Sequence, residues 1–155
     1  KSLEIRLKVL DGEHPDVAAS YNNIGNAYFN KGQYDLALAN HEKSLEIKLK
    51  VLGGDHPDVA TSYHNIGLTY REKGEYDLAL ANYEKSLEIE LKVLGDEHPD
   101  VAKSYNNIGH ATYHSTNNKT LALSYFLQAR AILLKTLGSE HPSTKYTQEW
   151  IDFLQ

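Results

Sequence analysis

The chain of 155 residues contains neither cysteine nor methionine. Without cysteine it forms no disulfide and offers no thiolate for catalysis, which permits a reducing compartment such as the cytoplasm. No apolar run approaches the roughly 18 residues that a membrane span needs, and the first residues lack the layout of a signal peptide. We therefore expect a cytoplasmic protein that does not associate with membranes.

Basic residues are also in deficit. The chain has 16 Lys and Arg against 21 Asp and Glu, a formal net charge of −5. Nucleic-acid binding would need basic residues clustered on one face, so neither DNA nor RNA is an expected partner. With 41% hydrophobic and 24% charged residues, the composition is typical of one globular domain, and we predict a single domain over residues 1–155.

What the chain does contain is a repeat of 42 residues. Residues 14–52 and 56–94 are identical at 30 of 39 positions, and a third copy begins at His98. Wound at 3.6 residues per turn, six of the nine differing positions fall within an arc of about 100°. These six are 19/61, 22/64, 26/68, 29/71, 30/72 and 33/75. In the second half of each copy only 41/83 and 48/90 differ, while the charged outer positions are unchanged. This pattern indicates a fixed scaffold with a changeable surface, although drift at exposed positions is an alternative.

Each copy is predicted to be a pair of helices. Val17, Tyr21, Ile24 and Tyr28 recur at spacings of three and four, as on one face of a helix. His-Pro-Asp at 14–16, 56–58 and 98–100 places Pro at the first helical position and Asp at the positive end of the helix dipole. Glycine at 32 and 74, and Asn-Asn at 117–118, supply residues that tolerate positive φ where the first helix ends. The sequence therefore predicts an all-α chain.

The predicted units follow one another along the chain. They are the second helix of a truncated repeat at 1–10, repeats at 14–52 and 56–94, a divergent repeat at 98–137 and a capping helix at 142–155. The divergent repeat holds one extra residue, and two positions for it are open. An insertion near Asn117 leaves Thr112 where Tyr28 and Tyr70 stand, whereas one near His110 keeps Tyr113 in place but bulges a helix. Because the chain begins with Lys inside a repeat, we expect it to come from a longer array.

Specific residues carry a resemblance to a known family. The shared pattern is an aromatic residue, Ile-Gly, a second aromatic, Gly-x-Tyr and Ala, at Tyr21, Ile24, Gly25, Tyr28, Gly32, Tyr34 and Ala37, and again at Tyr63, Ile66, Gly67, Tyr70, Gly74, Tyr76 and Ala79. The chain thus resembles the tetratricopeptide repeat (TPR) family, and its 42-residue period resembles the kinesin light chain subtype. The resemblance implies a right-handed α-solenoid of antiparallel helix pairs. It also implies a concave groove, lined by the first helices, that holds an extended or helical peptide of a partner protein.

This resemblance gives the variable arc a location on the inner wall. In kinesin light chain relatives an asparagine matching Asn23, Asn65 and Asn107 helps to hold peptides, and asparagine amides both donate and accept hydrogen bonds. The predicted peptide-binding groove comprises Asn22, Asn23, Asn26, Phe29, Asn30, Thr61, His64, Asn65, Leu68, Arg71, Lys103, Asn106, Asn107 and His110. Only Arg71 and Lys103 are basic, so the capture of chaperone carboxylates by several Lys and Arg side chains is not expected here.

Other functions find little support in the sequence. No glycine-rich phosphate loop, nucleophile elbow or isolated carboxylate pair is present, so we predict neither an enzyme nor a cofactor. The histidines at 14, 56, 98 and 141 recur once per unit, too far apart to share a zinc ion, and we expect them to cap helices. His64 and His110 could make binding depend on pH near 6.5. An alternative to peptide binding is end-to-end self-association through residues 1–10 and 142–155.

Overall fold

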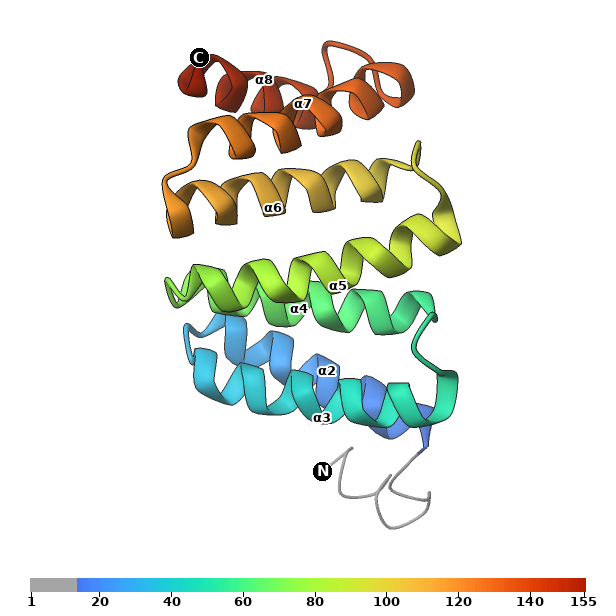
Figure 1. Ribbon diagram of the computed structural model, residues 1–155. Helices are drawn as coiled ribbons and strands as arrows, with labels where there is room; N and C mark the ends of the chain where they lie inside the picture. The colour runs from blue at the N-terminus through green and yellow to red at the C-terminus, as the bar shows by residue number, and fades with distance from the viewer. Residues whose placement is uncertain (1–13) are drawn as a thin grey trace.

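Seven helices make up the part of the chain that the structure, a computed structural model, describes, residues 14–155. The predicted helix at 1–10 lies outside these residues. In Figure 1 the helices stack in chain order from α2 to α8, each running antiparallel to the one before. They are α2 (Pro15–Asn30), α3 (Tyr34–Leu52), α4 (Pro57–Glu72), α5 (Tyr76–Leu94), α6 (Pro99–Thr116), α7 (Lys119–Thr136) and α8 (Pro142–Leu154). The predicted all-α solenoid of helix pairs is confirmed.

The helices pack as three pairs and one additional helix. The pairs are α2 with α3, α4 with α5 and α6 with α7, and α8 packs against α7. Helices α3 and α5 also contact the first helix of the following pair. Every second helix is therefore held between two first helices, which joins the repeats into one continuous stack.

Histidine caps the first helices, as expected. In the His-Pro-Asp segments proline is the first helical residue, and Nδ1 of His14 accepts a hydrogen bond from the backbone N–H of Asp16 at 3.1 Å. The same contact recurs at His56, His98 and His141. Each imidazole thus satisfies one of the N–H groups that a helix start leaves without a partner. Within residues 14–155, no three His, Cys, Asp or Glu side chains are placed to hold a metal ion.

The extra residue of the third repeat lies at the end of α6. This helix has 18 residues against 16 in α4, and it runs as uninterrupted α-helix to Thr116, so the alternative of a bulge near His110 is wrong. Asn117 then takes the left-handed conformation, with φ of 52°, where Gly74 has 78°. Thr112 is buried in line with Tyr70, and Tyr113 packs against the last hydrophobic cluster instead.

The core of each pair is built around a glycine of the first helix. Gly25, Gly67 and Gly109 lie so close to the second helix that an added Cβ would be within 2.7 to 2.9 Å of the facing ring. The facing residues are His41, Tyr83 and Phe126. All three are buried, so the variable pair 41/83 is a difference inside the core and not on the surface. Tyr21, Tyr63, Tyr70 and Tyr105 lie at the edge of the core, where they are half-buried against the clusters.

Candidate functional site: a row of hollows between the repeats

Five of the six variable positions in the arc lie on the first helices. The pairs 19/61, 22/64, 26/68, 29/71 and 30/72 belong to α2 and α4. The sixth pair, 33/75, does not, because Gln33 and Glu75 follow the turn and are the N-cap residues of α3 and α5. The variable arc on the first helices therefore comprises five pairs of positions and not six, because the sixth pair lies beyond the turn that ends each first helix.

Three hollows follow one another along the stack, each where a first helix, its second helix and the next first helix meet. The first, of about 260 Å³, lies between α2, α3 and α4, and its lining includes Asn22, Asn23 and Thr61. The second, of about 300 Å³, lies between α4, α5 and α6, and is lined by His64, Asn65 and Lys103 among others. The third, of about 580 Å³, lies between α6, α7 and α8, and is lined by Arg71, Lys103, Asn106, Asn107 and Tyr146 among others.

These hollows bring nine of the fourteen predicted groove residues together. His110 lines a fourth hollow, with Arg71 and Tyr146, near the turn that follows α4. The remaining predicted residues line none of these four hollows. Asn26 and Asn30 are exposed, Leu68 is half-buried, and the half-buried Phe29 contacts the ring of Tyr34 at 5.7 Å.

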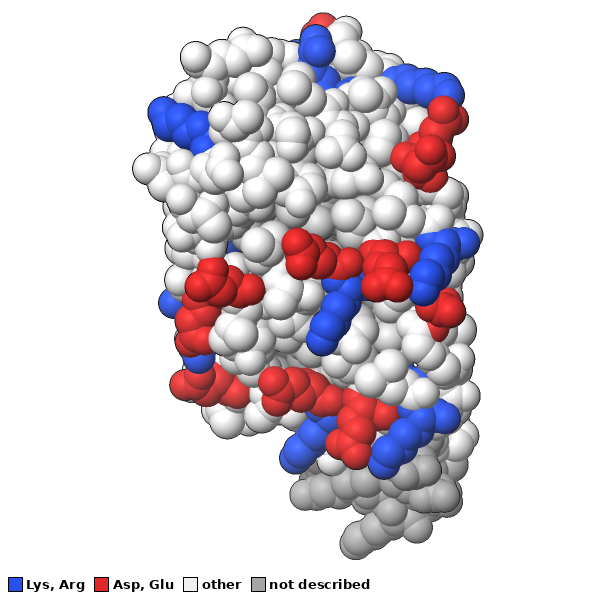
Figure 2. Space-filling view, in the orientation of Figure 1, with Lys and Arg blue, Asp and Glu red and all other residues white. Residues whose placement is uncertain are grey.

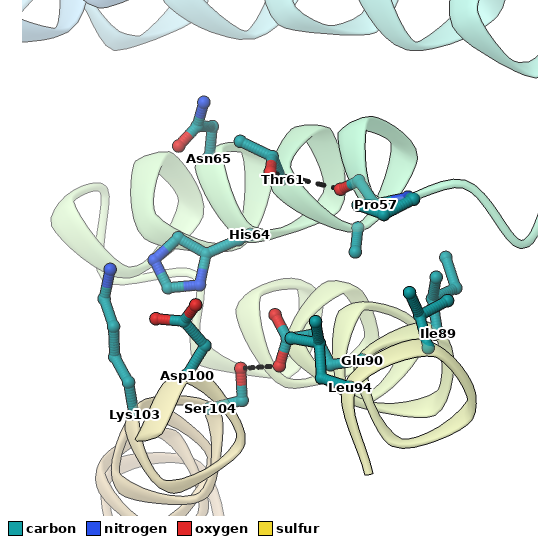
Figure 3. A pocket seen from close by; sticks show the side chains of 12 residues that line it. Pro57, Thr61, His64, Asn65, Ile89, Glu90, Leu94, Asp100, Lys103 and Ser104 are labelled. Carbon is teal, nitrogen blue, oxygen red and sulfur yellow. Dashed lines mark hydrogen bonds between the residues drawn. The ribbon is translucent and has the colours of Figure 1, made fainter. Parts of the chain in front are cut away.

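The second hollow shows how the side chains of three helices converge. In Figure 3 His64 projects from α4 toward Asp100 and Lys103 of α6, whereas Asn65 points away from them, and Glu90 of α5 lies close to Ser104 of α6. Ser104 Oγ donates a hydrogen bond of 2.6 Å to one carboxylate oxygen of Glu90, and Ser86 Oγ donates one of 2.9 Å to the other. The carboxylate is thereby fixed in place at the hollow.

Position 48/90 changes the charge of successive hollows. At the first hollow Lys48 donates through Nζ to Ser62 Oγ at 2.8 Å and to the carbonyl oxygen of Asp58 at 3.1 Å. Glu90 occupies the same place at the second hollow, and the apolar Leu133 occupies it at the third. Each hollow therefore presents a different chemistry through the same backbone geometry. The difference between Lys48 and Glu90 can be read from the sequence. The structure shows in addition that both residues lie beside the variable positions of the first helices.

Three of the predicted groove asparagines make contacts between repeats. Asn65 Nδ2 donates a hydrogen bond of 3.2 Å to Asn22 Oδ1, which links α4 to α2. Asn106 is only 8% exposed, and its Nδ2 donates to Thr147 Oγ1 at 2.9 Å. The side-chain amide of Asn106 is thus occupied by α8, although the residue also lines the third hollow. Asn23 is exposed and Asn107 is half-buried.

Burial changes the expected titration of the two groove histidines. Desolvation, aided by Lys103 and Arg71, lowers the pKa of His64 to about 4. Desolvation, followed by His114 and Arg71, lowers the pKa of His110 to about 4 as well. Both rings pack on aromatic side chains. The ring centroids of His64 and Tyr83 are 5.7 Å apart, and those of His110 and Trp150 are 5.1 Å apart. The prediction that these histidines titrate near pH 6.5 is therefore wrong.

Three aromatic residues of α8 occupy positions equivalent to predicted groove residues, and the sequence prediction missed them. Counted 43 residues on from Lys103, Asn107 and His110, the equivalent positions are Tyr146, Trp150 and Phe153. Tyr146 lines the third hollow, and Phe153 is 57% exposed. His98 and His141 are 43 residues apart, and this spacing could have identified the equivalent positions from the sequence. Trp150 packs against the last hydrophobic cluster, so only Tyr146 of the three lines a hollow.

The opposite stripe of α8 is polar. Where α6 has Ala102, Tyr105 and Gly109 against its second helix, the positions 43 residues later are Lys145, Gln148 and Asp152. Gln148 Nε2 donates to Asp152 Oδ1 at 2.6 Å, and Lys145 pairs with Glu140 at 2.9 Å. This stripe offers no apolar edge to another chain, and the alternative of end-to-end association stays a prediction. Residues 1–10, which would supply the other edge, lie outside the described residues.

Helix pairs stacked into one core, with hollows between successive first helices, define a helical-repeat protein. The tetratricopeptide repeat model matches residues 1–50, 16–89 and 65–135, and the chain belongs to the tetratricopeptide repeat family. A comparison with curated protein sequences gave no significant match. No helix within residues 14–155 is long and apolar enough to span a membrane.

Solved structures of similar fold include kinesin light chain-like proteins. A kinesin light chain protein of Podospora anserina with nearly identical TPR-like repeats is 30% identical, covers 98% of this chain and 71% of its own, and superimposes with a TM-score of 0.84. BtubC (BKLC) of P. vanneervenii, at 23% identity, covers 97% of this chain and 60% of its own, with a TM-score of 0.86. The TPR2B domain of yeast Sti1, solved in complex with pHsp70, is 17% identical, covers 88% of this chain and 94% of its own, with a TM-score of 0.67. The last two likenesses concern the fold alone.

Proposed function

We propose that this chain is a non-catalytic adaptor module that binds an extended or helical peptide segment of a partner protein along its row of hollows. The observation that carries the proposal is that three equivalent hollows differ in the residues that line them while the scaffold around them repeats. Tetratricopeptide repeats generally serve in protein–protein interaction, and the Sti1 domain has the same fold in a complex with a partner.

The spacing of the hollows suits a peptide read at intervals. Packed helices lie about 10 Å apart, and we take this as the distance between neighbouring hollows. An extended peptide advances about 3.3 Å per residue, so about every third side chain of the peptide would enter the next hollow. Asn23, Asn65 and Asn107 recur at the same intervals and can pair with the backbone of a peptide of any sequence. Lys48, Glu90 and Leu133 then set which side chain each hollow prefers.

Replacement of Asn65 and Asn107 by Ala tests the asparagines. If each loses about one hydrogen bond, a peptide selected by display on the wild-type protein should bind the double variant more weakly by about 1 to 3 kcal/mol. Fluorescence anisotropy with the labelled peptide measures the change in Kd.

Asn82→Ala is the matched control, because Asn82 lies on α5 and donates to the carbonyl oxygen of Leu78 in its own helix. It should leave Kd unchanged. Equal Kd values for the wild-type protein and the Asn65 and Asn107 double variant, with both folded by circular dichroism, would remove the groove assignment.

A further inference from the structure

The outer face of α7 differs from those of α3 and α5. At the outer positions where α3 has Glu42, Lys43 and Glu46, and α5 has the same residues 42 positions later, α7 has Leu127, Gln128 and Ala131. The register is fixed by the core, since Ala79 and Tyr83 of α5 correspond to the buried Ala122 and Phe126 of α7. The charges have therefore been replaced by uncharged side chains on one helix only.

The result is an exposed apolar stripe. Leu127 and Leu134 are 45% and 37% exposed, and with the exposed Ala131 they lie within about 60° on one side of the helix. Figure 2 shows the contrast on one face of the molecule, where red and blue side chains cross the surface over α3 and α5 and an uncharged area covers α7. From Leu127 to Leu134 the stripe runs about 10 Å at 1.5 Å per residue, enough to contact about two turns of a partner helix.

The charged residues of helix α7 itself have one sign. Helix α7 contains Lys119, Arg130 and Lys135 and no acidic residue, whereas α5 contains four acidic and two basic residues. Lys135 pairs with Glu97, and Lys119 lies over the ring of Phe153 at 5.7 Å. A second α7 placed against the first would bring like charges together, which disfavours another copy of this chain as the occupant.

We propose that the outer face of α7, through Leu127, Ala131 and Leu134, binds an amphipathic helix of a partner protein that carries an apolar stripe flanked by acidic residues. The helix lies along α7 with its apolar residues on the leucines, and its carboxylates reach toward Arg130. This surface is separate from the asparagines of the groove, so both sites can be occupied together.

The test uses two synthetic helical peptides with the same leucine stripe, one flanked by glutamates and the other by lysines. The glutamate peptide should bind the wild-type protein at least about tenfold more tightly, and its advantage should shrink at high salt because exposed charges are screened. The double substitution Leu127→Glu and Ala131→Glu, which restores the residues that α5 has, should weaken its binding at least about tenfold.

Three controls keep the outcome specific. Glu84→Gln on α5 and the Asn65 and Asn107 double variant of the groove should both leave binding of the glutamate peptide unchanged. Circular dichroism confirms that each variant is folded. Equal affinity for the two peptides, no binding of either, unchanged binding to the α7 variant, or a wild-type dimer in sedimentation that this variant abolishes would each overturn the proposal.

Discussion

Acidification from about pH 7 to about pH 4.5 is expected to destabilise the protein more than its exposed carboxylates explain, because His41 is buried in the neutral form. This ring is 1% exposed, packs on Gly25, and its Nδ1 has no hydrogen-bond partner. Burial, followed by the charge of Lys48, lowers the pKa of His41 from 6.5 to about 4. His64 and His110 have the same lowered pKa.

The direction of the effect follows from proton uptake on unfolding. Between pH 6.5 and about 4 the unfolded chain binds protons at these histidines and the folded chain does not. The stabilisation is complete above pH 6.5 and is lost as the pH falls toward 4. At about 1.4 kcal/mol per pKa unit, His41 alone accounts for a loss of about 3 kcal/mol.

His41→Phe tests this cause, because Phe126 occupies the same position in the third repeat. Urea unfolding of wild type and variant at several pH values measures the free energy of unfolding. The variant should be about 1 to 3 kcal/mol more stable near neutral pH, because a buried polar atom without a partner is removed, and it should lose less stability in acid. His56→Asn, at an exposed cap, should retain the slope of the wild type. Parallel pH profiles for wild type and His41→Phe would contradict the assignment.

Trp150→Ala is expected to remove about 3 kcal/mol or more from the free energy of unfolding, since replacing a packed aromatic residue by Ala costs about 3 to 5 kcal/mol. The indole stacks on Phe126 with ring centroids 5.3 Å apart and an interplanar angle of 4°. It also contacts the rings of Tyr113 and His110, with ring centroids 5.8 Å and 5.1 Å away. Trp150 therefore joins α8 to α6 and α7.

The loss should be local as well as large. In a repeat stack each unit contacts only its neighbours, so amide hydrogen exchange should accelerate in α7 and α8 and change little in α2 and α3. Phe153→Ala is the control, because this neighbouring ring is 57% exposed, and it should cost about 1 kcal/mol or less. Equal losses for the two variants, or exchange that accelerates evenly along the chain, would refute the role given to Trp150.

The fold could be predicted because the local signals agree with one another. Apolar spacing, His-Pro-Asp starts and glycine turns recur in each copy, and the structure places α2, α4 and α6 from the proline of each start onward. The identity of the copies also made the apolar stripes unambiguous. Where the repeat breaks, at α8, the same reasoning failed, and Tyr146, which lines the third hollow, was missed.

The details of the site depended on contacts that a sequence does not display. Asn106 matches the arc but is occupied by Thr147, a residue that lies 41 positions later in the divergent helix. His64 and His110 are polar by type, yet their burial between helices keeps them neutral. Conversely, Lys48 and Glu90 come from the second helices and still reach the hollows.

An exchange of charge between two hollows tests the central claim most directly. Lys48→Glu combined with Glu90→Lys leaves composition and net charge unchanged and swaps two residues that the repeats already accept at this position. Peptide display on wild type and on this double variant measures the preferred side chain at each position of the selected peptides. If the hollows recognise a peptide, the acidic and basic preferences at two positions about three residues apart should trade places. Identical selected sequences from both proteins would contradict the account.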